Sequence, residues 1–162
     1  MAPTADMDKL LVDKLDTKFC DEVAELPGGE NIRKCFACGT CAAGCPVTDV
    51  DPDYNPRTII RQVLFGMREE VLASPLLWSC LVCYRCTARC PQGVNFTDVM
   101  RVLRYLSVRN GHVPPDIVAR TEEIERVVQK LRLELIADTF RGRREALEEL
   151  KTQVGDRTNS EK

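Results

Sequence analysis

Apolar side chains recur at helical spacing near the start of the chain, within residues 7–26. The positions that form this stripe are Leu10, Leu11, Leu15, Phe19 and Val23. Pro27-Gly28-Gly29 follows directly, and this combination of proline and glycine is typical of the end of a helix. The pattern therefore predicts an N-terminal helical segment within residues 1–27.

A second helical pattern follows a turn rich in proline and aspartate at residues 51–56. Asn55 suits the N-cap position and Pro56 the first helical position, because the amide oxygen can accept backbone N–H groups and proline lacks one. The apolar face of this helix consists of Ile59, Ile60, Val63, Leu64 and Met67. Ser74-Pro75 is expected to close the region.

A third helical pattern begins near Asn95 or Thr97, either of which could cap it, and ends at Asn110-Gly111. Its inward-facing positions are Val99, Met100, Leu103 and Leu106. No segment alternates between apolar and polar residues as a half-buried strand does. The sequence therefore predicts an all-α fold, in which these apolar positions have packing roles.

Beyond Pro114-Pro115 the composition changes, because 17 of residues 116–151 are charged. Apolar positions keep a helical period as far as Ile136, and the period resumes past Gly142, so one long helix or two are predicted. The extension at 114–151 is either a helix with an ordinary solvated face or a docking element for a partner protein. Residues 152–162 are expected to form a flexible polar tail.

Length and charge exclude several classes of function. A chain of 162 residues with a net charge of -2 has no basic excess for a nucleic-acid backbone, and no dense lysine and arginine cluster supplies a local one. No apolar run approaches the ~18 residues that a membrane span needs. The first 14 residues lack the basic and apolar regions of a signal peptide. We therefore expect a cytoplasmic protein without membrane insertion.

Cysteine is the anomaly of the composition, since the chain has nine. Eight of them form two runs of identical spacing, C-x2-C-x2-C-x3-C-P, at residues 35–46 and 80–91. This spacing is similar to that of bacterial-type ferredoxins, in which such a loop wraps a 4Fe-4S cluster. The ninth, Cys20, falls on a predicted helix and is interpreted as a small buried apolar residue.

The resemblance to two-cluster ferredoxins implies a crossed set of ligands, because there the fourth cysteine of each motif binds the other cluster. Carried over by position, the ligands of cluster I are Cys35, Cys38, Cys41 and Cys90. The ligands of cluster II are Cys80, Cys83, Cys86 and Cys45. A disulfide framework and a pair of zinc sites are the alternatives. Disulfides do not suit a chain expected inside the cell, where thiols stay reduced, and zinc sites have no use for the third and fourth cysteine at this spacing or for the proline.

The connection between the motifs indicates the fold class. Small bacterial ferredoxins join their motifs through short β elements, whereas here residues 46–79 contain a predicted helix. The expected architecture is the α-helical ferredoxin, with two 4Fe-4S cluster loops in a domain at residues 28–113 and a C-terminal helical extension.

Two longer stretches carry a closer resemblance. Residues 77–94, with a Trp-x-Cys entry and a Cys-Pro-x-Gly-Val exit, and residues 29–41 resemble the two cluster motifs of the heterodisulfide reductase C subunit and its bacterial relatives. The resemblance implies an iron-sulfur protein that relays single electrons between the flavin-containing A subunit of such a complex and the B subunit, which has CCG motifs. This sequence has neither a CCG motif nor a glycine-rich dinucleotide fingerprint.

The alternatives from other functional classes are a free ferredoxin-like electron carrier and a zinc-binding interaction module. No residue of the chain itself is predicted to be catalytic. Four basic residues lie beside the thiols, at Arg33, Lys34, Arg85 and Arg89. They could raise the cluster potentials by favouring the more negative reduced state, or serve as solvated charges or partner contacts.

Overall fold

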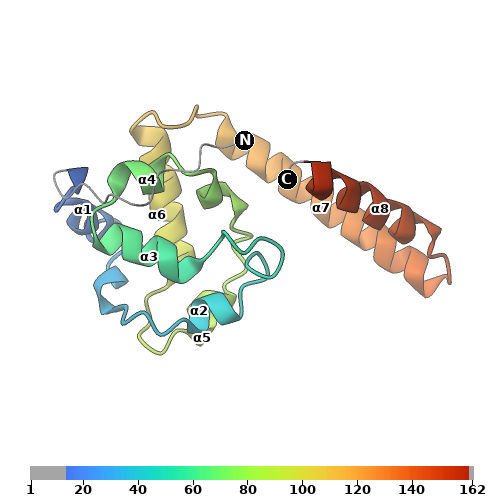
Figure 1. Ribbon diagram of the computed structural model, residues 1–162, viewed down its shortest axis with the longest axis horizontal. Helices are drawn as coiled ribbons and strands as arrows, with labels where there is room; N and C mark the ends of the chain where they lie inside the picture. Colours follow the sequence, from blue (N-terminus) through green and yellow to red (C-terminus); the bar gives the residue numbers. More distant parts are fainter. Residues whose placement is uncertain (1–13, 161–162) are drawn as a thin grey trace. The chain divides into compact units, whose positions relative to one another are not determined.

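The computed structural model describes residues 14–160 and the side chains of residues 14–154. Between residues 14 and 160 the chain forms helices joined by loops and contains no β-strand (Figure 1). The prediction of an all-α fold is therefore confirmed. The chain divides into two compact units with a boundary after Pro115. Across the described residues no helix combines the length and apolar character needed to cross a membrane.

The first unit contains helices α1 to α6 and two 3-10 helices. In chain order these are α1 (Phe19–Glu25), η2 (Ile32–Lys34), α2 (Thr40–Ala43), α3 (Pro56–Leu64), α4 (Arg68–Leu72), η3 (Pro75–Ser79), α5 (Arg85–Arg89) and α6 (Phe96–Arg109). The short helices α2 and α5 each contain the third cysteine of a run and lie side by side (Figure 1).

Helix α6 is the centre of the core, because it packs against α1, α4, α5 and η3. Its fully buried residues include the predicted Val99, Met100, Leu103 and Leu106. Burial of each such side chain contributes about 1.5–3 kcal/mol relative to exposure. The helix ends at Arg109 and Gly111 adopts a positive φ of 76°, as the pattern at Asn110-Gly111 predicts.

The start of α3 is set by the predicted cap. The Asn55 side chain accepts hydrogen bonds from the backbone N–H groups of Arg57 (3.0 Å) and Thr58 (3.3 Å). Pro56 occupies the first helical position. The buried face of the helix then presents Ile59, Ile60 and Val63 to the core. The turn before the helix is thereby fixed between the two cysteine loops.

Helix α3 is shorter than its apolar pattern, which runs on to Met67, because the chain breaks at Gly66. Gly66 has a φ of 76°, and its carbonyl accepts a hydrogen bond from the Asp16 N–H at 2.8 Å. A Cβ atom on Gly66 would collide with the Asp16 carbonyl oxygen. This close approach ends α3 and lets α4 begin at Arg68 in a new direction.

Helix α1 begins at Phe19, later than the apolar stripe predicts, and residues 7–13 of that stripe lie outside the described residues. The Asp16 carboxylate accepts the Lys18 N–H at 2.9 Å and pairs with Arg68 at 2.6 Å. Arg68 also pairs with Glu22. These contacts hold residues 14–18 in a turn, so tertiary pairing outweighs the local helical pattern here.

The second unit consists of α7 (Ile117–Phe140) and α8 (Glu145–Ser160). Of the two options left open, two helices are present, and Gly142 with a φ of 75° lies in the turn between them. Helix α8 continues to Ser160, whereas the sequence predicts a flexible tail from residue 152. Lys151 pairs with Glu148 at 2.9 Å and the Thr152 hydroxyl donates to the Glu148 carbonyl, both at helical spacing.

In the described part of its unit, the apolar stripe of α7 is left largely exposed. No side chain of this helix is buried, and the exposed positions include Ile124, Val127, Val128, Leu131 and Leu133. Its charged residues include the helical pairs Arg120–Asp116 (2.8 Å) and Arg126–Glu122 (3.4 Å). The helix therefore presents both apolar and charged side chains at its surface.

The close approach at Gly66 gives a testable prediction about stability. Gly66 and Gly111 share a φ of 76°, but a Cβ atom on Gly111 would meet nothing within 4 Å. We expect Gly111→Ala to cost about 1–2 kcal/mol through its left-handed backbone. Gly66→Ala should cost clearly more, because the methyl group also collides with Asp16. Thermal unfolding followed by circular dichroism compares the two variants, and equal losses would contradict the prediction.

Candidate metal centre

The two cysteine loops repeat one backbone conformation. Ala37 and Val82, the second residues after the first cysteine of each run, have φ values of 58° and 50°. Gly39 and Tyr84, two residues further on, have φ values of 84° and 59°. Valine and tyrosine rarely adopt this left-handed conformation, and such strain is concentrated at functional sites. The equal spacing in the sequence therefore corresponds to equal local structure.

The thiols of the two runs surround two hollows. The first hollow is lined by Cys35, Cys38, Cys41, Cys86 and Cys90. The second hollow is lined by Cys45, Cys80, Cys83 and Cys86. Each hollow thus receives the first three thiols of one run together with the fourth thiol of the other, and Cys86 borders both. All nine cysteines are free thiols, and the ninth, Cys20, is buried on α1 away from both linings.

Apolar side chains form most of the remaining walls. The first hollow encloses about 400 Å³, part of it open to solvent, and includes Ile60, Val94 and Phe96. The second encloses about 310 Å³ and includes Val47, Tyr54 and Phe96. Phe96 at the start of α6 contacts both spaces and is 2% exposed. The hollows are therefore built directly on the hydrophobic core.

The thiols differ in burial and in hydrogen bonding. Cys80 is buried, whereas Cys38 and Cys83, the second cysteines of the two runs, are exposed. The Cys38 sulfur lies 3.3 Å from the Thr40 hydroxyl. The Cys86 sulfur lies 3.3 Å from the hydroxyl of Thr97, which is itself buried. Each run therefore meets solvent at its second cysteine and the core at other positions.

The same differences alter the acidity of these groups. The Thr40 hydroxyl, which hydrogen-bonds the Cys38 thiol, lowers the pKa of that thiol. Burial raises the pKa of Cys41 to about 11, and it raises the pKa of Cys86 as well. Burial also raises the pKa of Tyr54 above its ordinary value, with further contributions from the neighbouring thiols. Binding a metal group to the buried thiols therefore requires their protons to be released.

Arginine side chains approach the hollows from several elements. Arg85 lines the second hollow, as its place in the cysteine run suggests. Arg57 on α3 lines the first, where its guanidinium lies close to Gly39. Sequence reasoning missed Arg57 because it is distant from both runs, and only its place at the start of the capped helix could have indicated it. Arg33, by contrast, pairs with Asp21.

Arg89 and Gly44 show how closely the two loops approach. They occupy the equivalent third position after Cys86 and Cys41, and a Cβ atom on Gly44 would collide with the Arg89 guanidinium. A larger residue at position 44 would therefore displace this guanidinium from the first loop. The contact brings a positive charge of the second loop to the first, across the pair α2 and α5.

Arg104 of α6 fixes the entry to the second cysteine run. Its guanidinium donates to the carbonyl oxygens of Leu77 (2.8 Å), Trp78 (3.3 Å) and Cys80 (2.7 Å). The same group lies 5.3 Å from the centroid of the Trp78 ring. Three carbonyls that would otherwise lack partners in the helical turn are satisfied by one rigid, planar donor group.

The ligands of a single metal ion converge on one point, whereas the thiols of a cluster site surround a larger space. Among residues 14–160, no three histidine, cysteine, aspartate or glutamate side chains are grouped so that they could hold a metal ion. The thiols instead line two hollows that are partly open to solvent.

Comparison with known proteins agrees with this geometry. A family model described as a 4Fe-4S dicluster domain matches residues 31–94, which include both cysteine runs. The C subunit of the H(2):CoB-CoM heterodisulfide,ferredoxin reductase of Methanothermobacter thermautotrophicus is 36% identical over 101 residues, which are 62% of this chain and 54% of that protein. The chain thus spans about half the length of that relative.

Two further relatives are covered more fully. The iron-sulfur C subunit of the CoB--CoM heterodisulfide reductase of Methanopyrus kandleri is 31% identical over 160 residues, covering 86% of this chain and 83% of the relative. The C subunit of the Ferredoxin:CoB-CoM heterodisulfide reductase of Methanosarcina mazei is 36% identical over 136 residues, covering 76% of this chain and 83% of the relative.

The helical fold, the paired cysteine loops and the matching dicluster model define a two-cluster 4Fe-4S protein of the α-helical ferredoxin class. Both cofactors expected from the cysteine spacing are thereby confirmed. At the level of family, the chain belongs to the C subunits of heterodisulfide reductases. The observed walls fit such clusters, since eight thiols in two groups face spaces that are otherwise largely apolar.

The position of Arg57 gives a prediction about the first hollow. Arg57→Gln removes a positive charge beside it, and the reduced cluster carries one more negative charge than the oxidised one. Because an exposed charge pair contributes only about 0.2–1 kcal/mol, we expect the reduction potential of that cluster to fall by roughly 10–40 mV.

Arg61→Gln is the matched control, since Arg61 lies one turn further along α3 with its guanidinium 5.2 Å from the Phe65 ring centroid. A redox titration followed by electron paramagnetic resonance measures both variants. Equal shifts in the two proteins would contradict a specific effect of Arg57.

Proposed function

We propose that this chain is the electron-transfer component of a heterodisulfide-reductase-like complex, in which it relays single electrons through its two 4Fe-4S clusters. In this proposal a flavin-containing A subunit supplies the electrons and a B subunit with CCG motifs receives them. Family membership supports the assignment, since the relatives are named as C subunits of heterodisulfide reductases. The chain itself performs no two-electron chemistry.

We propose that each cluster is bound by the first three cysteines of one run and the fourth cysteine of the other. The first cluster takes Cys35, Cys38, Cys41 and Cys90, and the second takes Cys80, Cys83, Cys86 and Cys45. The observation that carries this proposal is the lining of the hollows, because each contains the fourth cysteine of the opposite run. Cys86 borders both hollows, and we assign it to the second because the other thiols of its own run line that one.

Each cluster, when bound, accepts and releases one electron at a time. The side chains of this chain provide the conditions for that exchange. Eight thiolates hold the metal groups, while Ile60, Val94 and Phe96 exclude water from the inner walls. The contact of α2 with α5 keeps the two loops adjacent, and therefore keeps the distance between the sites short.

The ligand assignment is tested by anaerobic iron and sulfide assays. We expect about eight irons in the intact chain, because each of the two runs builds one four-iron site. A content near four would remove one site from the proposal.

The crossing of the ligands is tested by a cysteine variant. Cys90→Ser should damage the cluster held by the first run, although Cys90 belongs to the second. Electron paramagnetic resonance of the reduced variant identifies the altered cluster.

Cys20→Ser is the control for this experiment, since Cys20 lies outside both hollows. It should leave both clusters unchanged. Loss of the second-run cluster alone in Cys90→Ser would show that each run is self-contained and that the crossed assignment is wrong.

The role within a complex gives a separate prediction about the C-terminal unit. The exposed stripe of α7 has apolar side chains such as Ile124 and Val127, each more than half exposed, which a partner could cover. We expect a chain ending at Pro115 to keep about eight irons, from two four-iron clusters, but to lose co-purification with its partner proteins.

The full-length chain, expressed with the same partners, is the positive control. A shortened chain that still assembles into an active complex would show that residues 116–162 are dispensable for docking. Loss of iron from the shortened chain would instead make those residues part of the cluster domain.

A further inference from the structure

Tyr54 is a buried phenol in the wall of the second hollow. The side chain is 1% exposed and is among the largest fully buried ones in the described part of the chain. It lines the hollow together with Cys45, Cys80, Cys83 and Cys86. Tyr54 and Cys80 also belong to one cluster of buried side chains, so the phenol and this thiol share the same wall. Cys80 is itself only 8% exposed, so both residues are sheltered from water.

The backbone around Tyr54 is held in place from both sides. The Tyr54 N–H donates to the Asp51 carbonyl at 3.1 Å, and the Tyr54 carbonyl accepts the Thr48 hydroxyl at 2.8 Å. The Asp51 carboxylate also accepts the Asp53 N–H at 3.0 Å. Asn55, the next residue, caps α3. The ring therefore enters the hollow from a fixed turn.

The hydroxyl requires an explanation, because phenylalanine would fill nearly the same space without adding a polar group. A buried hydroxyl without a hydrogen-bond partner is unfavourable, so its presence in an apolar wall indicates an acceptor. A thiolate sulfur supplies one, and a bond from a neutral donor to a charged acceptor is stronger than one between neutral groups.

We propose that the Tyr54 hydroxyl donates a hydrogen bond to the Cys80 sulfur and thereby raises the reduction potential of the cluster in the second hollow. This inference rests on the proposed function, in which Cys80 is a ligand of that cluster. Reduction adds one electron from the donor protein and breaks no bond, and the phenol proton stays on Tyr54. The hydrogen bond stabilises the more negative reduced state by more than the oxidised state.

The distribution of buried hydroxyls supports an unequal pair of sites. Thr97 is 1% exposed, lines the second hollow and lies 3.3 Å from the Cys86 sulfur. In the first hollow, the Thr40 hydroxyl lies beside the Cys38 thiol, and this thiol is exposed to solvent. The second site thus has two donors sheltered from water, where hydrogen bonds are electrostatically stronger.

The test uses the full chain with both clusters, prepared without oxygen. In Tyr54→Phe we expect about eight irons, as two four-iron clusters contain, with one of the two midpoint potentials lowered. At a fixed solution potential, we expect the ratio of oxidised to reduced cluster to change by up to about tenfold. This change corresponds to a midpoint shift of about 59 mV for one electron. Cys83→Ser, which alters a proposed ligand of the second cluster, identifies the signal that moves.

Tyr105→Phe is the matched control, since Tyr105 is 54% exposed on α6 and faces the Arg109 guanidinium. It should move neither midpoint. Electron-nuclear double resonance in deuterated water supplies a second readout. We expect exchangeable deuterons from both hydroxyls to couple to the second cluster in the wild-type protein and in Tyr105→Phe. In Tyr54→Phe one of these couplings should be lost while that of Thr97 stays.

Unchanged midpoints in a Tyr54→Phe protein that keeps both clusters would overturn the inference while leaving the two-cluster function intact. A wild-type chain without two clusters would instead overturn the proposed function. If Tyr54→Phe loses its second cluster, the midpoint of that cluster cannot be measured, and the bond from Tyr54 is tested in the Thr97→Val protein instead. With the threonine donor removed, a deuteron coupled to the second cluster supports the bond from Tyr54, and absence of that coupling rejects it.

Discussion

The constraint on which the structure depends is that each thiol-lined hollow is completed by the opposite cysteine run. Cys90 reaches the hollow of the first run and Cys45 that of the second, so two loops that are distant in the sequence must lie together. This explains why α2 and α5 are adjacent and why Gly44 leaves room for the Arg89 guanidinium. Phe96 supports both hollows from the start of α6, so the core and the site share their central side chain.

Much of the fold could be predicted from the sequence, because its signals are local and strong. The cap at Asn55 and the glycine after α6 act through their own neighbours, and both elements begin or end where the pattern predicts. The doubled cysteine spacing acts in the same way, since equal spacing produced equal left-handed positions at residues 37 and 82. The paired hollows follow from this repetition once the loops are brought together.

The remaining features depend on contacts between distant residues, which periodicity does not encode. Gly66 ends α3 because the backbone of Asp16 lies against it, and the same aspartate delays the start of α1 through Arg68. Tyr54 lies in the turn between the motifs and Arg57 in the first turn of α3, so a search confined to the neighbours of each cysteine passes over them. Their position beside the thiols results from the capped start of α3, which directs one side chain into each hollow.

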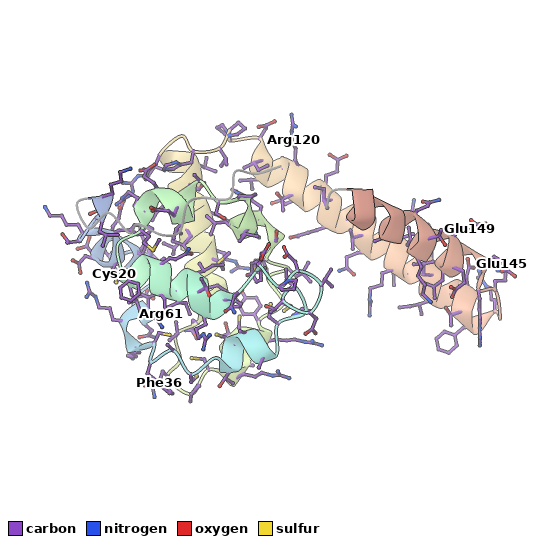
Figure 2. All side chains as sticks on the ribbon, in the orientation of Figure 1. Cys20, Phe36, Arg61, Arg120, Glu145 and Glu149 are labelled. Atoms are coloured by element: carbon purple, nitrogen blue, oxygen red, sulfur yellow. The ribbon has the colours of Figure 1, made fainter. Side chains whose placement is uncertain are left out.

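The surface of the first unit bears on the choice between a relay and a diffusing carrier. Each hollow reaches solvent at the second cysteine of its run, and an exposed apolar side chain follows the first cysteine in both runs. These side chains are Phe36 (Figure 2) and Leu81. Electron transfer requires a donor and an acceptor to approach the clusters closely, and exposed apolar groups favour protein contacts. A carrier that serves one partner at a time needs a single such face. Phe36 and Leu81 place one exposed apolar side chain beside each hollow, so both sites have a surface residue of the kind that the proposed relay would use.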